Sequence, residues 1–240
     1  MARLPRLNLA NIPQHIILRG NNRQICFFDE QDYKVYLAKL KEFSEKLLVA
    51  IHAYVLMTNH VHLLATPSDK TGVSRLIQRL GAYYVRYINK KYDRCGTLWQ
   101  GRYKSTLVDN EGYFLTVSRY IEMNPVRANM VEHPAAYSWS SFHRNALGIP
   151  IELITPYEIY QSLGNTDQAR QKSYLALFEQ QISESTLKEI RESINHGWVL
   201  GNDRFKAQIE ITTGRQTTSK LRGGDRKSRQ YLHKQKNQML

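Results

Sequence analysis

The sequence of 240 residues contains only two cysteines, Cys26 and Cys95, which lie far apart and form no CxxC pair. This excludes a disulfide framework and a zinc site built from cysteines. No apolar run approaches the roughly 18 residues needed to cross a bilayer. The basic N-terminus is not followed by the apolar stretch of a signal peptide. We therefore expect a cytoplasmic protein that does not enter a membrane.

Acidic residues are scarce as well. The chain has 21 Asp and Glu against 34 Lys and Arg, and its formal net charge is +13. A surplus of this size favours a polyanionic partner such as nucleic acid. The hydrophobic content of 42% and the charged content of 23% are ordinary for a globular protein and exclude wholesale disorder.

Short extended patterns and longer helical patterns alternate along the first 148 residues. Turn residues and β-like runs predict strands at 15–19, 49–57, 59–66 and 102–108. Apolar spacing of three and four residues predicts helices at 29–48, 73–92 and 110–124. This order predicts an α+β fold with a ferredoxin-like antiparallel sheet whose helices pack on one face.

The sequence changes character after residue 148. Residues 149–213 are rich in helical patterns, at 167–182, 185–195 and 202–212, and predict a small helical C-terminal extension. Residues 214–240 are strongly basic and lack apolar periodicity, which predicts a disordered tail that contacts a polyanion. We therefore divide the chain into a domain at 1–148, a helical subdomain at 149–213 and a basic tail at 214–240.

Two histidines stand two positions apart in a predicted strand. Because side chains alternate along a strand, His60 and His62 point to one face while Val61 and Leu63 point to the other. Two neutral imidazoles that converge on one point are sound ligands for a divalent ion. Such a pair is more often two polar side chains on a solvent-facing strand, so alone it is a weak indication of a metal site.

A tyrosine and an asparagine stand one turn apart in the predicted helix 110–124, for which Asp109 or Asn110 is the expected N-terminal cap. Tyr120 and Asn124 share a face beside the apolar stripe, at the rim between core and cleft. Pro125 ends the helix. By residue type alone, the pair also fits a half-buried tyrosine and an asparagine that terminates a helix.

Basic residues gather on one side of the predicted helix 73–92, within about 60° of one another and opposite its apolar side. With three further cations they form a candidate surface for DNA phosphates, on which Tyr or Trp side chains stack with unpaired bases. The alternative for these basic residues of helix 73–92, which we call the basic stripe, is that they only form a solvated helix face. The candidate DNA-binding residues are Arg75, Arg79, Arg86, Lys90, Arg102, Lys104 and Arg127.

Four ordered blocks carry a resemblance to a known family. They lie at residues 59–64 (NHVHLL), 96–104 (GTLWQGRYK), 120–128 (YIEMNPVRA) and 137–141 (YSWSS). Over residues 10–145 the chain resembles the IS200-like tyrosine transposases of the HUH class, which act on single-stranded DNA, and in particular the REP-associated tyrosine transposases. The resemblance implies a ferredoxin-like catalytic domain, in agreement with the predicted order of elements.

The resemblance also implies a mechanism and a site. Tyr120 is the implied nucleophile, and His60, His62 and Asn124 are the implied ligands of Mg²⁺ or Mn²⁺, although some relatives carry Gln where this chain has Asn124. The implied reaction cleaves and rejoins single-stranded DNA through a covalent 5′-phosphotyrosine, with hairpin-forming repetitive extragenic elements as substrate. Because one phosphodiester replaces another, no nucleotide cofactor is needed. Glu122, on the helix side away from Tyr120, is not the expected general base.

Two other functions stay open from the sequence. One is a domesticated regulator that binds DNA hairpins without cutting them. The other is a metallohydrolase that uses the paired histidines and a water nucleophile, for which Tyr120 is dispensable. For the transposase we expect single-stranded or hairpin DNA as the partner, a monomer or homodimer, and a nucleoid-associated location.

Overall fold

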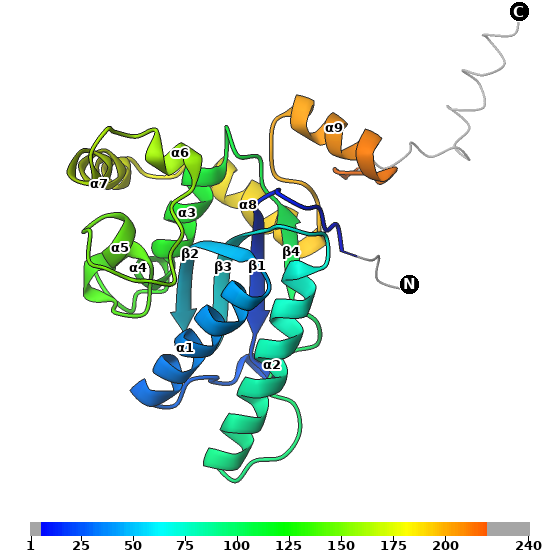
Figure 1. The fold of residues 1–240 in the computed structure, drawn as a ribbon, viewed down its shortest axis with the longest axis vertical. Helices are drawn as coiled ribbons and strands as arrows, with labels where there is room; N and C mark the ends of the chain where they lie inside the picture. Colours follow the sequence, from blue (N-terminus) through cyan, green and yellow to red (C-terminus); the bar gives the residue numbers. More distant parts are fainter. Residues whose placement is uncertain (1–5, 220–240) are drawn as a thin grey trace, which may run out of the picture.

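One four-stranded antiparallel sheet organises the fold in a computed structural model that describes residues 6–219 (Figure 1). The strands follow the order β2-β3-β1-β4, and all three pairings are antiparallel. This α+β arrangement is compatible with the ferredoxin-like order. The strands are β1 (Gln14–Arg19), β2 (Val49–Met57), β3 (His60–Pro67) and β4 (Lys104–Leu107).

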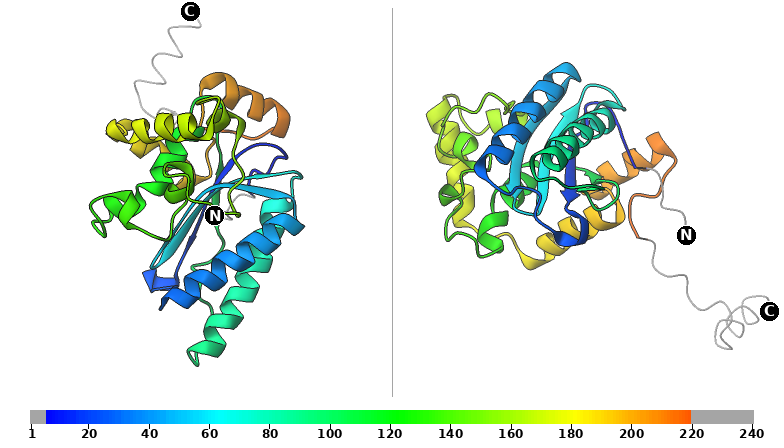
Figure 2. Two further views of the ribbon diagram at one scale, coloured as in Figure 1. Left: turned by 60° about the vertical axis from the view of Figure 1, so that its left-hand side comes forward. Right: turned by 90° about the horizontal axis from the view of Figure 1, so that it is seen from below.

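Helices cover both faces of the sheet (Figure 2). The helices α1 (Glu30–Lys46) and α2 (Gly72–Lys91) pack side by side on one face, against a core that includes Ile16 and Leu63. The helices α3 (Phe114–Glu122) and α8 (Glu184–His196) lie on the other face, where Leu64 is buried. The expectation of helices on one face therefore holds for α1 and α2 and is wrong for α3.

A two-residue turn at Thr58 and Asn59 joins β2 to β3 and sets their register. Met57 pairs with His60 and Val55 pairs with His62. Both histidines therefore lie at the start of β3, next to the turn. Alternation along β3 buries Val61 and Leu63 under α1 and α2 and turns the histidines toward the opposite face.

The predicted helix 110–124 is shorter and is broken near its end. Met123 interrupts it, and α4 (Asn124–Arg127) begins anew with Pro125 in its first turn, where a missing N–H costs nothing. Asp109 does not cap α3, because the helix begins only at Phe114; the Asp109 carboxylate accepts from the backbone N–H of Glu111 and of Asn202. Because of this break, Asn124 and Arg127 lie in α4, and both side chains donate to the backbone carbonyl of Tyr120 near the end of α3.

The chain after residue 128 adds further helices, and α8 and Leu200 pack beside β4 and the residue that follows it. α8 ends at Gly197, which adopts a φ of 70° that favours glycine. The start of the expected tail is anchored, because Thr217 is buried and its carbonyl accepts from Val199 N–H at 2.9 Å. Residues 220–240 of that tail lie outside the described residues. The other helices are α5 (Phe142–Asn145), α6 (Glu158–Gln161), α7 (Asp167–Ala176), α9 (Asp203–Thr213) and the 3₁₀ turns η1 (Asn21–Arg23), η2 (Pro134–Ala136) and η3 (Leu177–Glu179).

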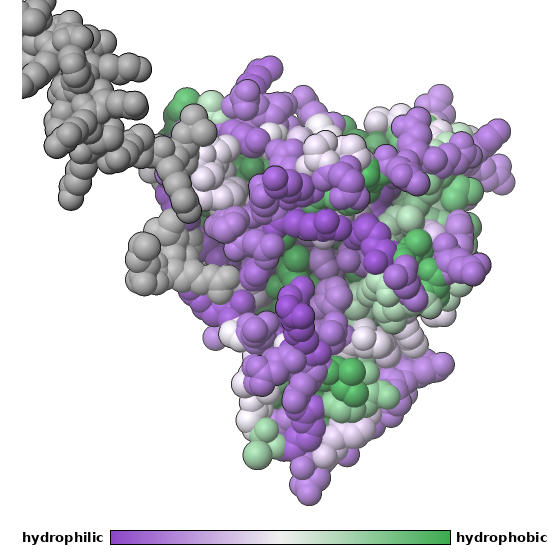
Figure 3. Space-filling view, turned by 180° about the vertical axis from the view of Figure 1, so that it is seen from behind, coloured by the Kyte–Doolittle hydropathy of each residue, from purple (hydrophilic) through white to green (hydrophobic). Residues whose placement is uncertain are grey.

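The surface behind the face seen in Figure 1 is hydrophilic over most of its area, with apolar side chains in separate patches (Figure 3). Within residues 6–219, none of the helices combines the length and the apolar character that a membrane crossing requires.

Candidate active site

The two motif histidines lie beside each other at the start of β3. Their ring centroids are 5.1 Å apart, and the side chain of His62 is buried, with 4% of the residue exposed. In the antiparallel register, Arg19 of β1 stands opposite His60 and Ile17 stands opposite His62. The diagonal neighbour of His62 on β1 is His15, within reach of its side chain.

Hydrogen bonds hold one nitrogen of each ring. His60 Nδ1 lies 2.6 Å from Asn59 Oδ1, and His62 Nδ1 lies 2.9 Å from His15 Nε2. Neither Nε2 has a hydrogen-bond partner among the described residues. A ligating imidazole is commonly oriented in this way, with the nitrogen away from the metal bound to a second group.

Burial keeps these imidazoles neutral. It lowers the pKa of His60 to about 4 and that of His15 to about 3, and the charges of Arg19 and Arg127 respectively lower them further. Burial also holds the pKa of His62 well below its usual value, helped by the neighbouring histidines and arginines. Neutral imidazoles keep a lone pair for coordination, which protonated ones lack.

His15 was not singled out in the sequence, although it is the only contact recorded for His62 Nδ1 among the described residues. Nothing in a single sequence marks it, because its place beside His62 depends on the pairing of β1 with β3. The available signal is its position at the start of a predicted strand, on the same face as Arg19.

The helix α3 brings Tyr120 to the histidines. Its ring centroid lies 5.8 Å from that of His15 and 6.0 Å from that of His62, edge to face in both cases, and 6% of the residue is exposed. Asn124 Nδ2 donates to the Tyr120 carbonyl at 3.0 Å. The Arg127 guanidinium donates to the same carbonyl at 2.6 Å and lies 4.1 Å from the centre of the Tyr120 ring.

The charges around Tyr120 are positive. Burial lowers the pKa of Arg127, and the charge of Arg191 on α8 lowers it further. Glu122, the carboxylate nearest in sequence, is fully buried elsewhere and accepts hydrogen bonds from Ser141, Asn145 and Tyr174. Its burial raises its pKa to about 7. This arrangement favours an anion beside the tyrosine.

Comparisons with known proteins address the same part of the chain. Residues 8–124 match the family model described as IS200-like transposase. This segment therefore belongs to the IS200-like transposase family. No curated protein matches the chain.

Solved structures are similar to this transposase domain. A REP-associated tyrosine transposase bound to a REP hairpin is 17% identical, with a TM-score of 0.52 over 66% of this chain and 93% of that one. A protein from Deinococcus radiodurans R1 described as a transposase is 19% identical, with a TM-score of 0.36 over 50% and 96%. A bacterial tRNA(His) guanylyltransferase-like protein with GTP is 12% identical, with a TM-score of 0.34 over 55% and 72%. The matched family is one of transposases, so residues 8–124 are those of a DNA transposase, a class of DNA-cleaving enzyme.

The paired histidines fit a divalent ion that has few protein ligands. His60 and His62 each keep a free Nε2, and the amide nitrogen of Asn124 is engaged with the carbonyls of Tyr120 and Ile121, which leaves its oxygen as the only ligating atom. Among residues 6–219, no group of three or more His, Cys, Asp or Glu side chains is arranged to hold a metal. The set therefore needs oxygen ligands from outside the protein to complete it.

The other predicted DNA-binding residues do not all gather at Tyr120. Arg127 covers its ring, and Lys104 is on the neighbouring β4, hydrogen-bonded to Asn195 of α8 at 2.7 Å. Arg102 precedes β4 and lines a cavity beside α2. The basic stripe, on α2, is exposed and lies on the face opposite α3, with Arg75 paired to Asp69.

Proposed function

We propose that this transposase cleaves and rejoins single-stranded DNA, with Tyr120 as the nucleophile and a covalent 5′-phosphotyrosine as the intermediate. One observation carries the proposal: a buried phenol from α3 and two neutral imidazoles from β3 meet on one face of the sheet. We also propose the division into a catalytic domain at 1–148, a helical subdomain at 149–213 and a basic tail at 214–240.

The proposed chemistry is a balanced exchange of phosphodiesters. The Tyr120 oxygen forms a bond to phosphorus as the bond from phosphorus to the 3′ oxygen breaks, and the phenolic proton is balanced by the one that the 3′-hydroxyl gains. His60, His62 and the Asn124 oxygen would hold Mg²⁺ or Mn²⁺. When bound, the ion would polarise the scissile phosphate and stabilise the charge that develops during transfer.

The chain's own cations take part in the proposal. Arg127 lies over the Tyr120 ring and is bonded to the Tyr120 backbone, so a phosphate that reaches the phenol also meets this guanidinium. A guanidinium binds phosphate oxygens through a planar pair of donors. Arg127 therefore holds the phosphate against the nucleophile.

Hairpin-forming repetitive extragenic elements are the proposed substrate. The solved relative with the matching fold is bound to a REP hairpin. The positive charge of the chain suits a phosphate backbone.

A denaturing gel tests the proposal. Labelled hairpin DNA with single-stranded flanks is incubated with the protein and Mn²⁺, and a protein–DNA adduct is expected that is absent in Tyr120→Phe. The matched control is Tyr113→Phe, the same change at the start of α3, where the hydroxyl bonds only to Glu189 among the described residues. Cleavage without an adduct would identify a metallohydrolase, and bound but uncut DNA would identify the hairpin-binding regulator.

A further inference from the structure

We propose that the cavity between α2 and the segment 99–103 binds one unpaired nucleobase of the DNA strand. This inference rests on the proposed function, because it assigns part of the same substrate. The cavity has a volume of about 500 Å³, a size typical of sites for small ligands. We call it the α2 cavity, and the residues used below are Arg19, Gln78, Gly81, Trp99, Arg102 and Tyr103.

Flat aromatic surfaces and amides line the α2 cavity. Trp99 and Tyr103 are half-buried, so each ring is partly covered by protein and partly open. The Tyr103 ring already stacks with a planar group, since the Arg6 guanidinium lies 3.6 Å from its centre. Aromatic rings bind bases of any sequence by stacking, and a side-chain amide such as that of Gln78 can pair with a base edge.

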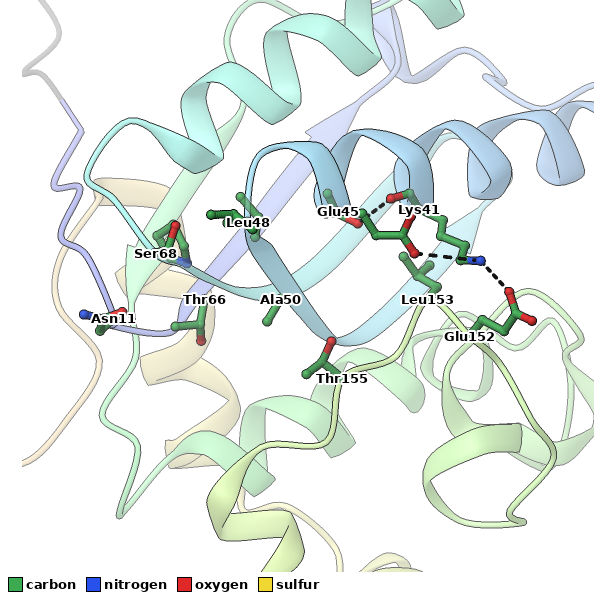
Figure 4. Close-up of a pocket in the computed structure, with 13 residues that line it drawn as sticks. Asn11, Lys41, Glu45, Leu48, Ala50, Thr66, Ser68, Glu152, Leu153 and Thr155 are labelled. Atoms are coloured by element: carbon green, nitrogen blue, oxygen red, sulfur yellow. Dashed lines mark hydrogen bonds and ion pairs between the residues drawn. The ribbon is translucent and has the colours of Figure 1, made fainter.

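The charge of the α2 cavity suits a nucleotide within a strand. Arg6, Arg19 and Arg102 line it, and no carboxylate does. A second cavity, of about 410 Å³, shows the contrast (Figure 4): its Lys41 is paired with Glu45 and Glu152, and no aromatic ring lines it. Among the cavities of this size in residues 6–219, only the α2 cavity is lined by both aromatic rings and arginines, with no Asp or Glu in its lining.

Gly81 keeps one wall of the α2 cavity open. It lies inside the long helix α2, where glycine weakens a helix relative to alanine. A Cβ at this position would meet only the edge of Trp99, at the ordinary contact distance of 3.9 Å from Nε1, so a methyl group would fit. Gly81 therefore leaves the space beside Trp99 without a side chain, at a cost to the helix.

The α2 cavity also lies next to the proposed catalytic site. Arg19, which lines it, stands opposite His60 in the sheet. A strand whose scissile phosphate is held at His60 would pass Arg19 at the end of β1 and place a neighbouring nucleotide in the cavity. The cavity would position the strand by one base while Tyr120 acts on the phosphate.

An abasic scan tests the assignment. The probes are hairpin oligonucleotides in which each unpaired flanking nucleotide is replaced in turn by an abasic residue, and their dissociation constants are measured by fluorescence anisotropy with the full chain. Loss of a stacked base is expected to weaken binding about tenfold or more at one position, and by much less elsewhere.

Gly81→Leu should fill the α2 cavity, weaken binding of the intact probe about tenfold and remove the position dependence of the scan. Ala82→Leu, one residue along α2 and exposed, is the matched control and should leave the scan unchanged. Thermal melting shows whether Gly81→Leu folds, and Gly81→Ala should give a smaller effect in the same direction.

The outcomes separate the two proposals. A flat scan in the unmodified protein, or a scan that Gly81→Leu leaves unchanged, would overturn the base-binding assignment even if the Tyr120 adduct forms. A position-dependent scan without any adduct would support the cavity and overturn the proposed cleavage. Free deoxynucleoside monophosphates that bind as tightly as the intact probe would identify a free-nucleotide site and also overturn the assignment.

Discussion

Single residues decide whether the paired histidines can act as ligands. An imidazole offers a lone pair at Nε2 only when its proton sits on Nδ1, and an acceptor at Nδ1 stabilises that tautomer. Asn59 Oδ1 is such an acceptor for His60. For His62 the group within hydrogen-bond distance of Nδ1 is His15 Nε2, at 2.9 Å. A proton on His62 Nδ1 requires His15 Nε2 to be the acceptor, so the tautomer of His15 on β1 and that of His62 on β3 are coupled.

Replacing His15 by leucine should therefore weaken Mn²⁺ binding to the protein–DNA complex about 10- to 100-fold, because His62 loses its orienting partner. The measurement is a titration followed by electron paramagnetic resonance of free Mn²⁺. His15→Gln, whose side-chain oxygen can accept from His62, should recover part of the affinity. His52→Leu removes another buried histidine, bonded to Thr66 and Thr155, and should leave Mn²⁺ affinity intact. Equal losses in both leucine variants would refute the orienting role.

Arg127 is expected to matter more for the reaction than for binding. Arg127→Gln should slow adduct formation at saturating DNA about 100-fold, since it removes a preorganised cation beside the phosphate. It should lower the dependence of log affinity on log salt by about 0.7. The control is Lys34→Gln, which removes one positive charge from an exposed position of α1, on the other face of the sheet. An Arg127→Gln variant with a normal adduct rate would contradict this role.

At the scale of elements, one carboxylate links α1 to the end of α2, the two helices on the face of the sheet away from Tyr120. Asp32 in the first turn of α1 is buried and accepts from the backbone of Phe28 at 2.8 Å. Near the C-terminus of α2 it is met by Lys91 at 2.8 Å and by the Tyr92 hydroxyl at 2.8 Å. The same residue thus caps α1 and fixes the end of α2.

Asp32→Ala should lower the free energy of unfolding by roughly 3 kcal/mol, because Tyr87 loses its acceptor and Lys91 and Tyr92 keep only the exposed carboxylate of Asp29. Asp29→Ala, which removes an exposed cap, should cost about 1 kcal/mol. Urea denaturation measures both. Adduct formation at low temperature should persist in Asp32→Ala, since α1 and α2 lie on the face away from Tyr120. Loss of the adduct in a folded Asp32→Ala protein would contradict this separation.

The elements also show what a sequence can predict. Strands β2 and β3 begin and end within a residue of their expected bounds, because alternation and a tight turn are local signals. The cap predicted at Asp109 or Asn110 was wrong, because residues 110–113 form a turn and α3 begins only at Phe114. The helix–sheet faces and the His15–His62 contact depend on pairing between distant strands, which no local pattern records. Tyr120 and the histidines were identified from motifs, but their meeting is visible only in the fold.

At the scale of the whole molecule, folding keeps an unusual set of histidines neutral. Burial lowers the pKa of His52 to about 4, as it lowers those of His15 and His60, and His62 titrates well below its usual value. In the unfolded chain each has a pKa near 6.5. Below that pH, unfolding therefore takes up about four protons. Glu122 opposes this by about one proton, because its pKa of about 7 is above its unfolded value.

The net uptake of about three protons predicts that stability falls as pH falls. Stability is fully present above about pH 7 and should decrease by about 4 kcal/mol per pH unit as pH drops toward 5, where the unfolded chain binds protons that the folded protein excludes. Urea unfolding at pH 7.5, 6.5 and 5.5 measures the slope. His52→Gln should reduce the number of protons taken up on unfolding by about one and so make the slope smaller. Glu122→Gln should increase that number by about one and make the slope larger. A free energy of unfolding that is constant over this range would show that these imidazoles are protonated in the folded protein, and the neutral pair that the proposed metal site requires would then be absent.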